Sequence, residues 1–466
     1  MTNEGKGIGA DNAGNMNDFV HSGMTNPDCT AKRENDSAKP STRTSLGSGS
    51  AEWIELYNTV HTHAFGTPLR VMDHGKGARL WDVDGNEYLD FLAGIAVNSL
   101  GYAHPRWVAA VNEQAGKTAH VSNYFASVPQ IELAARLLQI AGAPEGSLVY
   151  FANSGAESNE AAIKLARLYG TKLLGAEREQ AGAPARIIAL THGFHGRTMG
   201  ALSTTWKPSI RHPFEPLLPA VEFVECGDLA AMRESFDSAG RPGVGPVAAV
   251  MLELIQGEAG VRPLDPRYVK GVRELCDSHR SLLIVDEVQT GIGRTGQWFA
   301  FQREDLSGGV MPDIVTFAKG VAGGFPMGGM IAFGRPLASL FTPGMHGSTF
   351  AGGPLAAAAG LATLSVIEEE GLVGNAEQRG EQLRRGIMAC GNPLFAAVRG
   401  RGLLNAVQLA RPCAHAAMNW ALDHGLIVNA VAPDVLRLAP PLIVSEADIA
   451  EAVSILAAMP TDLSSD

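Results

Sequence analysis

The sequence has few cysteines, and it lacks the residue spacing of a metal site. Five of the 466 residues are Cys, and they are far apart, with no CxxC pair or other ligand pattern. Dispersed cysteines of this kind are typical of a reducing compartment. We therefore expect a cytoplasmic protein with neither a disulfide framework nor a bound metal ion.

Positive charge and long hydrophobic runs are also scarce. The 37 Lys and Arg are outnumbered by 48 Asp and Glu, which gives a net charge of −11. Such a charge repels phosphate backbones, so nucleic acid is not an expected partner. The longest uncharged stretch, 336–367, is interrupted by Pro and Gly before about 20 apolar residues accumulate. We expect no membrane span.

The first fifty residues lack the features of a targeting segment. They contain no apolar run of the kind found in a secretion signal. A transit peptide is poor in acids, whereas residues 1–50 carry six Asp and Glu. This composition predicts a disordered tail over residues 1–50.

Glycine and apolar strand-like runs are abundant. The 54 glycines amount to about 12% of the chain against a usual ~7%, which suits loops that approach a ligand closely. After Ala51, apolar runs alternate with amphipathic helical stretches, and this alternation predicts an α/β fold with a mostly parallel sheet. The seven expected strands are 148–152, 186–191, 221–225, 247–254, 282–288, 314–318 and 330–333.

The pattern of predicted secondary structure changes near Gly360, where helical runs are followed by short strands. We expect a smaller α+β domain after this point. Residues 79–90 are predicted to form a hairpin around Asp84-Gly85-Asn86, because these residues tolerate positive φ. The expected organisation is an N-terminal segment at 51–115 that packs with the small domain, a large domain at 116–360, and the small domain at 361–466.

The segment Asn153-Ser154-Gly155-Ala156-Glu157 follows a predicted strand and begins a predicted helix. The unpaired N–H groups of Gly155 and Ala156 could bind a phosphate there. An ordinary N-cap is the alternative, since Ser and Asn cap many helices. Further along the same helix, we expect Glu160 and Lys164 to form an exposed i,i+4 pair.

A glycine-rich loop, His192-Gly193-Phe194-His195-Gly196-Arg197-Thr198, follows the next predicted strand. Open α/β sheets bind their ligands at this edge. Phe194 could cover a ring and Arg197 could grip a carboxylate. Arg197 as a plain surface cation stays open as the alternative.

Two further strands each end in a charged residue. Asp286 ends the run 282–286, and Lys319 follows the run 314–318. A partly buried lysine has a lowered pKa and reacts more readily with an aldehyde, as Schiff-base chemistry requires. A lysine that extends to solvent is the alternative. Together, this acid, this lysine and the phosphate-ready helix start favour pyridoxal phosphate (PLP).

A dehydrogenase is a reading from another class, because Gly291 to Gly296 match GxGxxG. In a dinucleotide fold these glycines follow the strand directly, whereas Asp286 to Thr290 intervene here. A PLP-binding protein without catalysis is a second alternative.

Taken in order, these segments resemble the class III (fold type I) PLP-dependent aminotransferases from about Thr67 to Ile443. No single segment is decisive, but their order and spacing together are specific. The matching segments are Gly94-Ile95-Ala96-Val97-Asn98, Gly101-Tyr102-Ala103-His104-Pro105, Asn153 to Glu157, Phe194 to Thr198, Ile255-Gln256-Gly257-Glu258, Asp286 to Gly291, Ala318-Lys319 and Thr349-Phe350.

The resemblance implies a cofactor-binding role for eight residues. Lys319 would bind PLP covalently and shuttle the proton, and Asp286 would pair with the pyridine nitrogen. The others are Ser154, Gly155 and Ala156 near the phosphate, Phe194 on the ring face, Gln289 at the ring hydroxyl, and Thr349 from the neighbouring subunit of a homodimer.

The resemblance also implies how small-molecule substrates bind. Arg197 would grip the side-chain carboxylate of glutamate or 2-oxoglutarate, and Arg437 the α-carboxylate. Glu258 would cover Arg437 when an ω-amino substrate enters. Asn123 and Ser348 are further expected substrate contacts.

The implied reaction transfers the δ-amino group of N2-acetylornithine to 2-oxoglutarate. Succinylornithine, ornithine and 4-aminobutyrate are the alternative donors. Arg79 favours the acetylated donor, because the ornithine-specific branch usually has Tyr at the corresponding place.

Overall fold

The computed structural model describes residues 49–465, and these residues form one compact unit. Residues 1–48 of the expected tail lie outside the described part. Ser50 already begins a helix, α1 (Ser50–Val60). The expected domain boundaries at 116 and 361 stay predictions.

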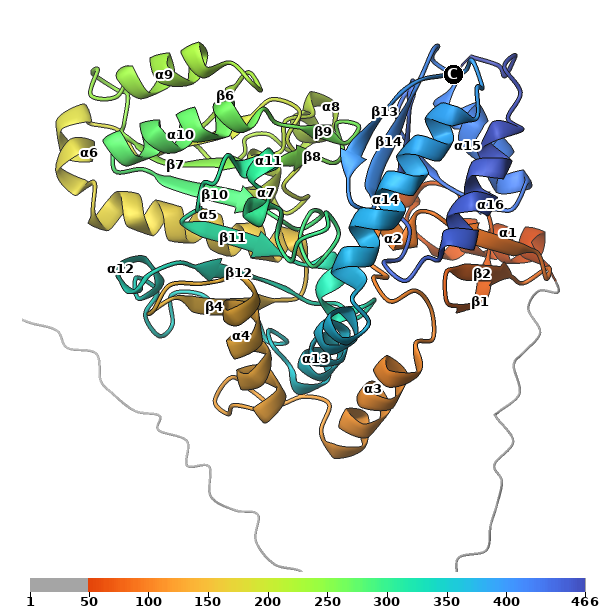
Figure 1. The fold of residues 1–466 in the computed structure, drawn as a ribbon. Coiled ribbons are helices and arrows are strands. Elements are labelled where there is room, and N and C mark those ends of the chain that lie inside the picture. Colours follow the sequence, from red (N-terminus) through yellow and green to blue (C-terminus); the bar gives the residue numbers. More distant parts are fainter. Residues whose placement is uncertain (1–48, 466) are drawn as a thin grey trace, which may run out of the picture. The chain divides into compact units, whose positions relative to one another are not determined.

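A seven-stranded sheet forms the centre of the fold (Figure 1). Its strands pair in parallel except for β12, which is antiparallel to both of its neighbours. The expected mostly parallel sheet is therefore confirmed. In spatial order the strands are β4 (Leu148–Ala152), β12 (Gly328–Ala332), β11 (Ile314–Phe317), β10 (Leu282–Asp286), β7 (Val247–Leu252), β5 (Arg186–Leu190) and β6 (Val221–Val224).

Helices cover both faces of this sheet. Successive side chains of a strand point to opposite faces, so the apolar strands present apolar side chains on both faces. On one face, the apolar side of α5 (Gly155–Lys172) packs against Met251 and Ile284. On the other, α10 (Pro266–Ser278) buries Val272 in the cluster that contains Val250. Strands β7 and β10 are buried along their whole length, as expected of central parallel strands.

There are two smaller four-stranded sheets: one combines N-terminal strands with a C-terminal strand, and the other is entirely C-terminal. The antiparallel hairpin of β2 and β3 confirms the turn predicted around residues 84–86. Strand β3 also pairs in parallel with β15, more than 300 residues later in the sequence. One sheet consists of β1 (Met72–Lys76), β2 (Arg79–Asp82), β3 (Glu87–Asp90) and β15 (Leu426–Ile427), and the other of β13 (Phe395–Arg401), β14 (Leu404–Leu409), β17 (Val435–Leu438) and β16 (Asn429–Ala432).

The remaining elements are short or cover the sheets. A two-stranded ladder joins β8 (Ile255–Gln256) and β9 (Arg262–Pro263). The other helices are η1 (His63–Phe65), α2 (Ala93–Ala96), α3 (Pro105–Lys117), α4 (Val128–Ile140), α6 (Gly175–Ala181), α7 (Met199–Ser203), α8 (Pro208–Arg211), η2 (His212–Phe214), α9 (Leu229–Asp237), η3 (Ala300–Gln302), α11 (Glu304–Ser307), η4 (Lys319–Ala322), α12 (Arg335–Ala338), α13 (Pro354–Glu369), α14 (Leu372–Ala389), α15 (Ala414–Asp423) and α16 (Glu446–Ala457).

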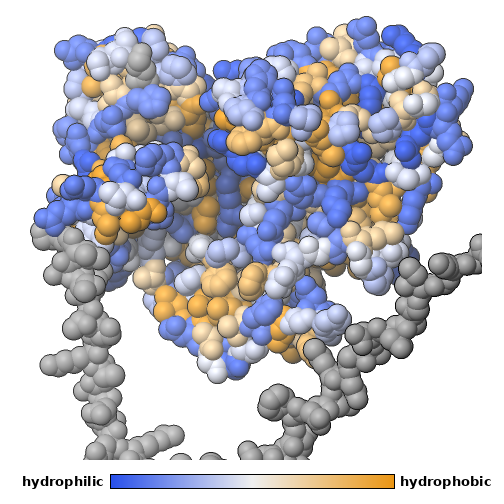
Figure 2. Space-filling model, turned by 180° about the vertical axis from the view of Figure 1, so that it is seen from behind, coloured by the Kyte–Doolittle hydropathy of each residue, from blue (hydrophilic) through white to orange (hydrophobic). Residues whose placement is uncertain are grey.

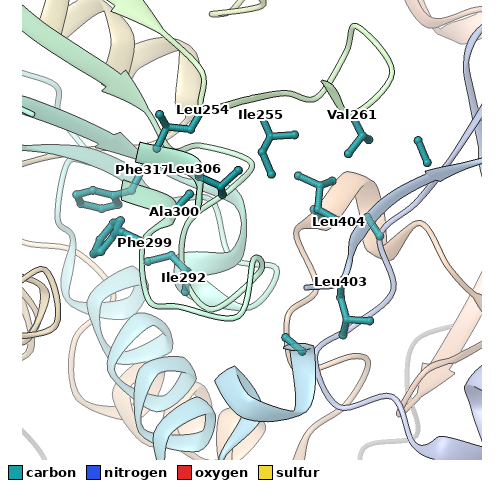
Figure 3. Close-up of a cluster of buried hydrophobic side chains, with 14 of the residues drawn as sticks. Leu254, Ile255, Val261, Ile292, Phe299, Ala300, Leu306, Phe317, Leu403 and Leu404 are labelled. Atoms are coloured by element: carbon teal, nitrogen blue, oxygen red, sulfur yellow. The ribbon is translucent and has the colours of Figure 1, made fainter. Parts of the chain in front are cut away.

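One hydrophobic cluster connects the central sheet to the C-terminal sheet. Figure 3 shows Leu404, the first residue of β14, and the preceding Leu403 on the side where Ile255 and Val261 lie. All four side chains are fully buried. The cluster thereby fixes the C-terminal sheet, which carries Arg437, beside the loops that follow β7.

No helix within residues 49–465 is both long and apolar enough to cross a bilayer.

Candidate active site

A cavity of about 460 Å³ lies where the strands of the central sheet end. Residues that follow β4, β5, β10 and β11 line it, and open α/β sheets bind their ligands at this edge. The structure brings nine of the sequence-predicted site residues to this cavity. They are Ser154, Gly155, Ala156, Phe194, Arg197, Glu258, Asp286, Gln289 and Lys319.

The first wall of the cavity is the N-terminus of α5. The Ser154 side chain accepts a hydrogen bond from the Glu157 N–H at 3.2 Å, so it is an N-cap. A Cβ added to Gly155 would lie 2.7 Å from Val288 Cγ1, and only glycine allows this close packing. The helix start therefore offers N–H groups to an anion while Ser154 holds its geometry.

Asp286 is the buried acid of the cavity, 4% exposed. It accepts hydrogen bonds from His195 Nδ1 and Asn159 Nδ2, each at 2.8 Å. Burial alone would raise its pKa, but the hydrogen bond and charge of His195 outweigh it and hold the pKa of Asp286 below its usual range. The cavity thus contains an ionised carboxylate that can pair with a ring N–H⁺.

The sequence did not predict either side-chain hydrogen-bond partner of Asp286, His195 or Asn159. The sequence assigns no role to His195, but its hydrogen bond to Asp286 raises the pKa of His195 although burial opposes this. Asn159 was not considered at all. Its position one turn after Gly155, on the helix face toward the cavity, is the one pattern that could have indicated it.

Lys319 follows β11 and lines the cavity. Desolvation lowers the pKa of its ammonium, although the nearby Glu258 carboxylate opposes this. Its backbone is in the left-handed region at φ 43°, a strained conformation that tends to occur at functional sites. Because Lys319 faces the cavity, the alternative of a lysine extending into bulk solvent does not hold.

Arg437 does not itself line the cavity, but it forms an ion pair with Glu258, which does. Arg437 is 1% exposed, and its Nη1 lies 2.5 Å from Glu258 Oε1. Burial raises the pKa of Glu258, but the guanidinium more than compensates and keeps that pKa below its usual range. Gln289 Oε1 also accepts a hydrogen bond from Arg437 Nη1, at 3.3 Å. Gln289, expected at a ring hydroxyl, therefore also contacts this ion pair.

The loop after β5 carries Phe194 and Arg197, with Arg197 Cζ 5.9 Å from the centre of the Phe194 ring. Glu160 of α5 fastens this loop by accepting hydrogen bonds from Thr198 Oγ1 at 2.6 Å and Gly200 N–H at 2.9 Å. Lys164 donates instead to the carbonyl oxygen of Met345. The expected Glu160–Lys164 pair is therefore wrong, because the start of α7 offers Glu160 several donors at once.

Besides Arg437, three predicted site residues do not line the cavity of their own chain. Asn123, Ser348 and Thr349 line a separate hollow of about 400 Å³. Asn123 Nδ2 donates to the Ser348 carbonyl oxygen at 3.0 Å, and Asn153 Nδ2 donates to Ser348 Oγ at 2.7 Å. Asn153 lines the main cavity, so Ser348 is one residue removed from it.

Arg79 is not at the cavity either. Its guanidinium pairs with Glu451 of α16 at 2.6 Å and with Glu87 at 2.9 Å. The suggestion that Arg79 indicates the donor is therefore not supported by its position, and these contacts explain the residue by packing of β2 against α16.

Comparisons with known proteins agree with this geometry. The family model for aminotransferase class-III matches residues 61–459. The chain is 71% identical to acetylornithine aminotransferase from Bifidobacterium longum, over 90% of this chain and 98% of that protein. It is 47% identical to the enzyme of the same name from Streptomyces coelicolor, over 86% and 93%.

Solved structures give the same picture. Acetylornithine aminotransferase from Elizabethkingia anophelis superimposes with a TM-score of 0.75 at 33% identity, over 88% of this chain and 98% of that one. Ornithine aminotransferase from Toxoplasma gondii, described with partial occupancy of PLP at its active site, gives a TM-score of 0.80 at 31% identity, over 88% and 94%.

Two buried acids near the cavity were not found from the sequence. Glu253 accepts hydrogen bonds from the N–H groups of Phe194 and Gly257, and burial raises its pKa to about 7. Glu287 accepts from the N–H groups of Ala300 and Phe301. Burial raises the pKa of Glu287 from 4.5 to about 7. Glu253 thus connects two loops at the site, and Glu287 holds the segment after β10 against η3.

The raised pKa of Glu287 makes its contribution to stability depend on pH. The folded protein binds this proton more tightly than the unfolded chain, so the contribution is complete below about pH 4.5 and is lost as the pH rises through about 7. Relative to Glu287→Gln, the free energy of unfolding of the wild-type protein should fall by about 3 kcal/mol between pH 4.5 and pH 7, because each pH unit contributes about 1.4 kcal/mol. Urea unfolding of the holoenzyme across this range measures the difference, with Glu132→Gln at an exposed position as control. A difference that does not change with pH would contradict the assignment.

Proposed function

The chain belongs to the class-III aminotransferases, and from this premise we propose that it transfers the δ-amino group of N2-acetylornithine to 2-oxoglutarate. The products are N-acetylglutamate 5-semialdehyde and glutamate, and the reaction belongs to arginine biosynthesis. The observation that carries the proposal is one cavity lined by Lys319, Asp286 and Glu258, with Glu258 paired to the buried Arg437, in a chain 71% identical to an acetylornithine aminotransferase.

The residues of the cavity fit the cofactor PLP. The α5 N-terminus would hold the phosphate through the N–H groups of Gly155 and Ala156, two residues that line the cavity. The ionised Asp286 would pair with the ring nitrogen, and Phe194 would cover the ring face. When bound, PLP supplies an aldehyde for the amine and a ring that accepts the electrons of the substrate carbon.

Lys319 and Asp286 have distinct tasks in this chemistry. Desolvation of Lys319 increases the fraction of neutral amine, and only a neutral Nζ can attack an aldehyde or accept a proton from carbon. Asp286 keeps its negative charge through His195 and Asn159, so it would stabilise a proton on the ring nitrogen of PLP without taking that proton up. The two residues come from adjacent strands, β11 and β10.

Two arginines explain how one cavity accepts two different substrates. 2-Oxoglutarate has two carboxylates, one for Arg437 and one for Arg197. An ω-amino donor has no carboxylate next to the reacting carbon, so Glu258 stays on Arg437 and satisfies its buried charge. Withdrawal of Glu258 would then open Arg437 for the keto acid.

The alternative donors are succinylornithine, ornithine and 4-aminobutyrate. Free ornithine keeps a specific observation in its favour, namely the fold similarity to the Toxoplasma gondii ornithine aminotransferase. The higher identity to acetylornithine aminotransferases outweighs it.

A homodimer in the cytoplasm, with no nucleic acid or membrane partner, completes the proposal. Asn123, Ser348 and Thr349 would serve the cavity of the second copy, since they lie outside their own. Nearby apolar side chains are open to solvent in the single chain, with Tyr124 93% and Phe350 64% exposed. Figure 2 shows hydrophobic side chains at the lower end of the molecule, where Figure 1 draws α3 and α4.

Replacing Lys319 by Ala should remove the covalent attachment of PLP and lower kcat by several orders of magnitude, because nucleophile and base are lost together. The visible spectrum of the purified protein and steady-state rates measure both effects. Lys270→Ala, an exposed lysine on α10, is the matched control and should behave as wild type. Near-normal turnover in Lys319→Ala would refute the mechanism, and a bound cofactor that no amino donor converts would indicate a binding protein without catalysis.

The donor is tested by comparing kcat/KM for N2-acetylornithine, succinylornithine, ornithine and 4-aminobutyrate with 2-oxoglutarate as acceptor. We expect acetylornithine to be preferred by at least about tenfold over free ornithine, since a site formed for the acyl group leaves a second ammonium desolvated. A preference for free ornithine would overturn the assignment of the donor while leaving the reaction class intact.

The assembly is tested by light scattering of the holoenzyme. We expect a species of twice the mass of one chain, and Tyr124→Asp should shift it toward monomer because a charge would enter a buried apolar contact. Phe214→Asp, at another exposed aromatic residue, is the control. A monomeric and fully active wild type would contradict the shared site.

A further inference from the structure

Asn429 is a second partner of the buried Arg437 guanidinium. Its Oδ1 accepts a hydrogen bond from Arg437 Nη2 at 2.7 Å, whereas Glu258 is bound to Nη1. The antiparallel pairing of β16 and β17 places Asn429 directly across from Arg437, so neighbouring backbone fixes this contact. Neither side chain belongs to the large helices, and both come from the short C-terminal strands.

The two contacts differ in what happens when a keto acid binds. The α-carboxylate of the acceptor and the Glu258 carboxylate would compete for Nη1, so Glu258 must withdraw. Removing one member of a buried ion pair is costly, and the Arg437 side chain must keep its position while Glu258 is away. Nε of Arg437 has no hydrogen-bond partner among residues 49–465, and the Gln289 contact is long, at 3.3 Å. Asn429 is the short contact that does not depend on Glu258.

We propose that Asn429 is a positioning residue that holds Arg437 in place while Glu258 is withdrawn, and thereby serves the keto-acid half of the reaction. A neutral amide suits this task, because it accepts a hydrogen bond without cancelling the guanidinium charge. A carboxylate at the same place would bind Arg437 permanently and compete with the substrate. The inference rests on the proposed function, since it requires that Arg437 be covered in one half-reaction and open in the other.

The test separates the two half-reactions in the holoenzyme of wild type, Asn429→Ala and Asn429→Asp. Rapid mixing with N2-acetylornithine alone measures the donor half, and mixing the aminated enzyme with 2-oxoglutarate alone measures the acceptor half. Calorimetric titration with glutarate, a dicarboxylate that cannot react, measures binding without turnover. Asn375→Ala is the structural control, because Asn375 donates to the carbonyl oxygens of Leu442 and Val444 just beyond β17.

We expect Asn429→Ala to weaken 2-oxoglutarate and glutarate binding about tenfold, the effect of losing one hydrogen bond to a charged group. Asn429→Asp should weaken both further, and acetylornithine should change by less than about twofold in either variant. Asn375→Ala should affect both half-reactions alike.

Equal effects of Asn429→Ala on the two half-reactions would reduce Asn429 to a structural residue and overturn the inference. Unchanged glutarate binding in both Asn429 variants would do the same. If wild type fails to react with acetylornithine, the proposed function fails instead, and glutarate binding still decides whether Asn429 positions Arg437.

Discussion

The site depends on a carboxylate that stays ionised inside the protein. Asp286 is buried at the end of β10, where desolvation alone would favour its neutral form. His195 and Asn159 compensate with short hydrogen bonds to the same Oδ2 atom. These partners come from a different strand end and from α5, so the charge of Asp286 exists only when the sheet, the helix and the loop after β5 are assembled together. Much of the rest of the cavity is arranged around this charge.

Much of the fold could be predicted from the sequence because the signals are local. The run 282–286 is buried at every position, and buried parallel strands are continuous apolar runs. The hairpin at 79–90 follows from Asp84-Gly85-Asn86, whose backbone preferences define the turn. The residue that ends each strand was therefore predictable too, which is why Asp286 and Lys319 could be placed at one sheet edge.

Other features could not be predicted, because they depend on contacts between distant segments. The i,i+4 spacing within one helix predicts a pair between Glu160 and Lys164. Once the chain is folded, the start of α7 supplies better donors to Glu160. Arg79 similarly finds Glu451 about 370 residues away in the sequence. The burial that raises the pKa values of Glu253 and Glu287 is also a property of the assembled core rather than of their neighbours in sequence.

The parallel pairing of β3 with β15 has a consequence for how the chain is made. Leu89 and Asp90 align with Leu426 and Ile427, so the edge of β3 stays uncovered until nearly the whole polypeptide has left the ribosome. Loop closure over such a distance is slow, and an open strand edge invites pairing with other chains. During synthesis, the early hairpin therefore waits for a partner strand from the far end of the chain, and chaperones can protect its open edge in that interval.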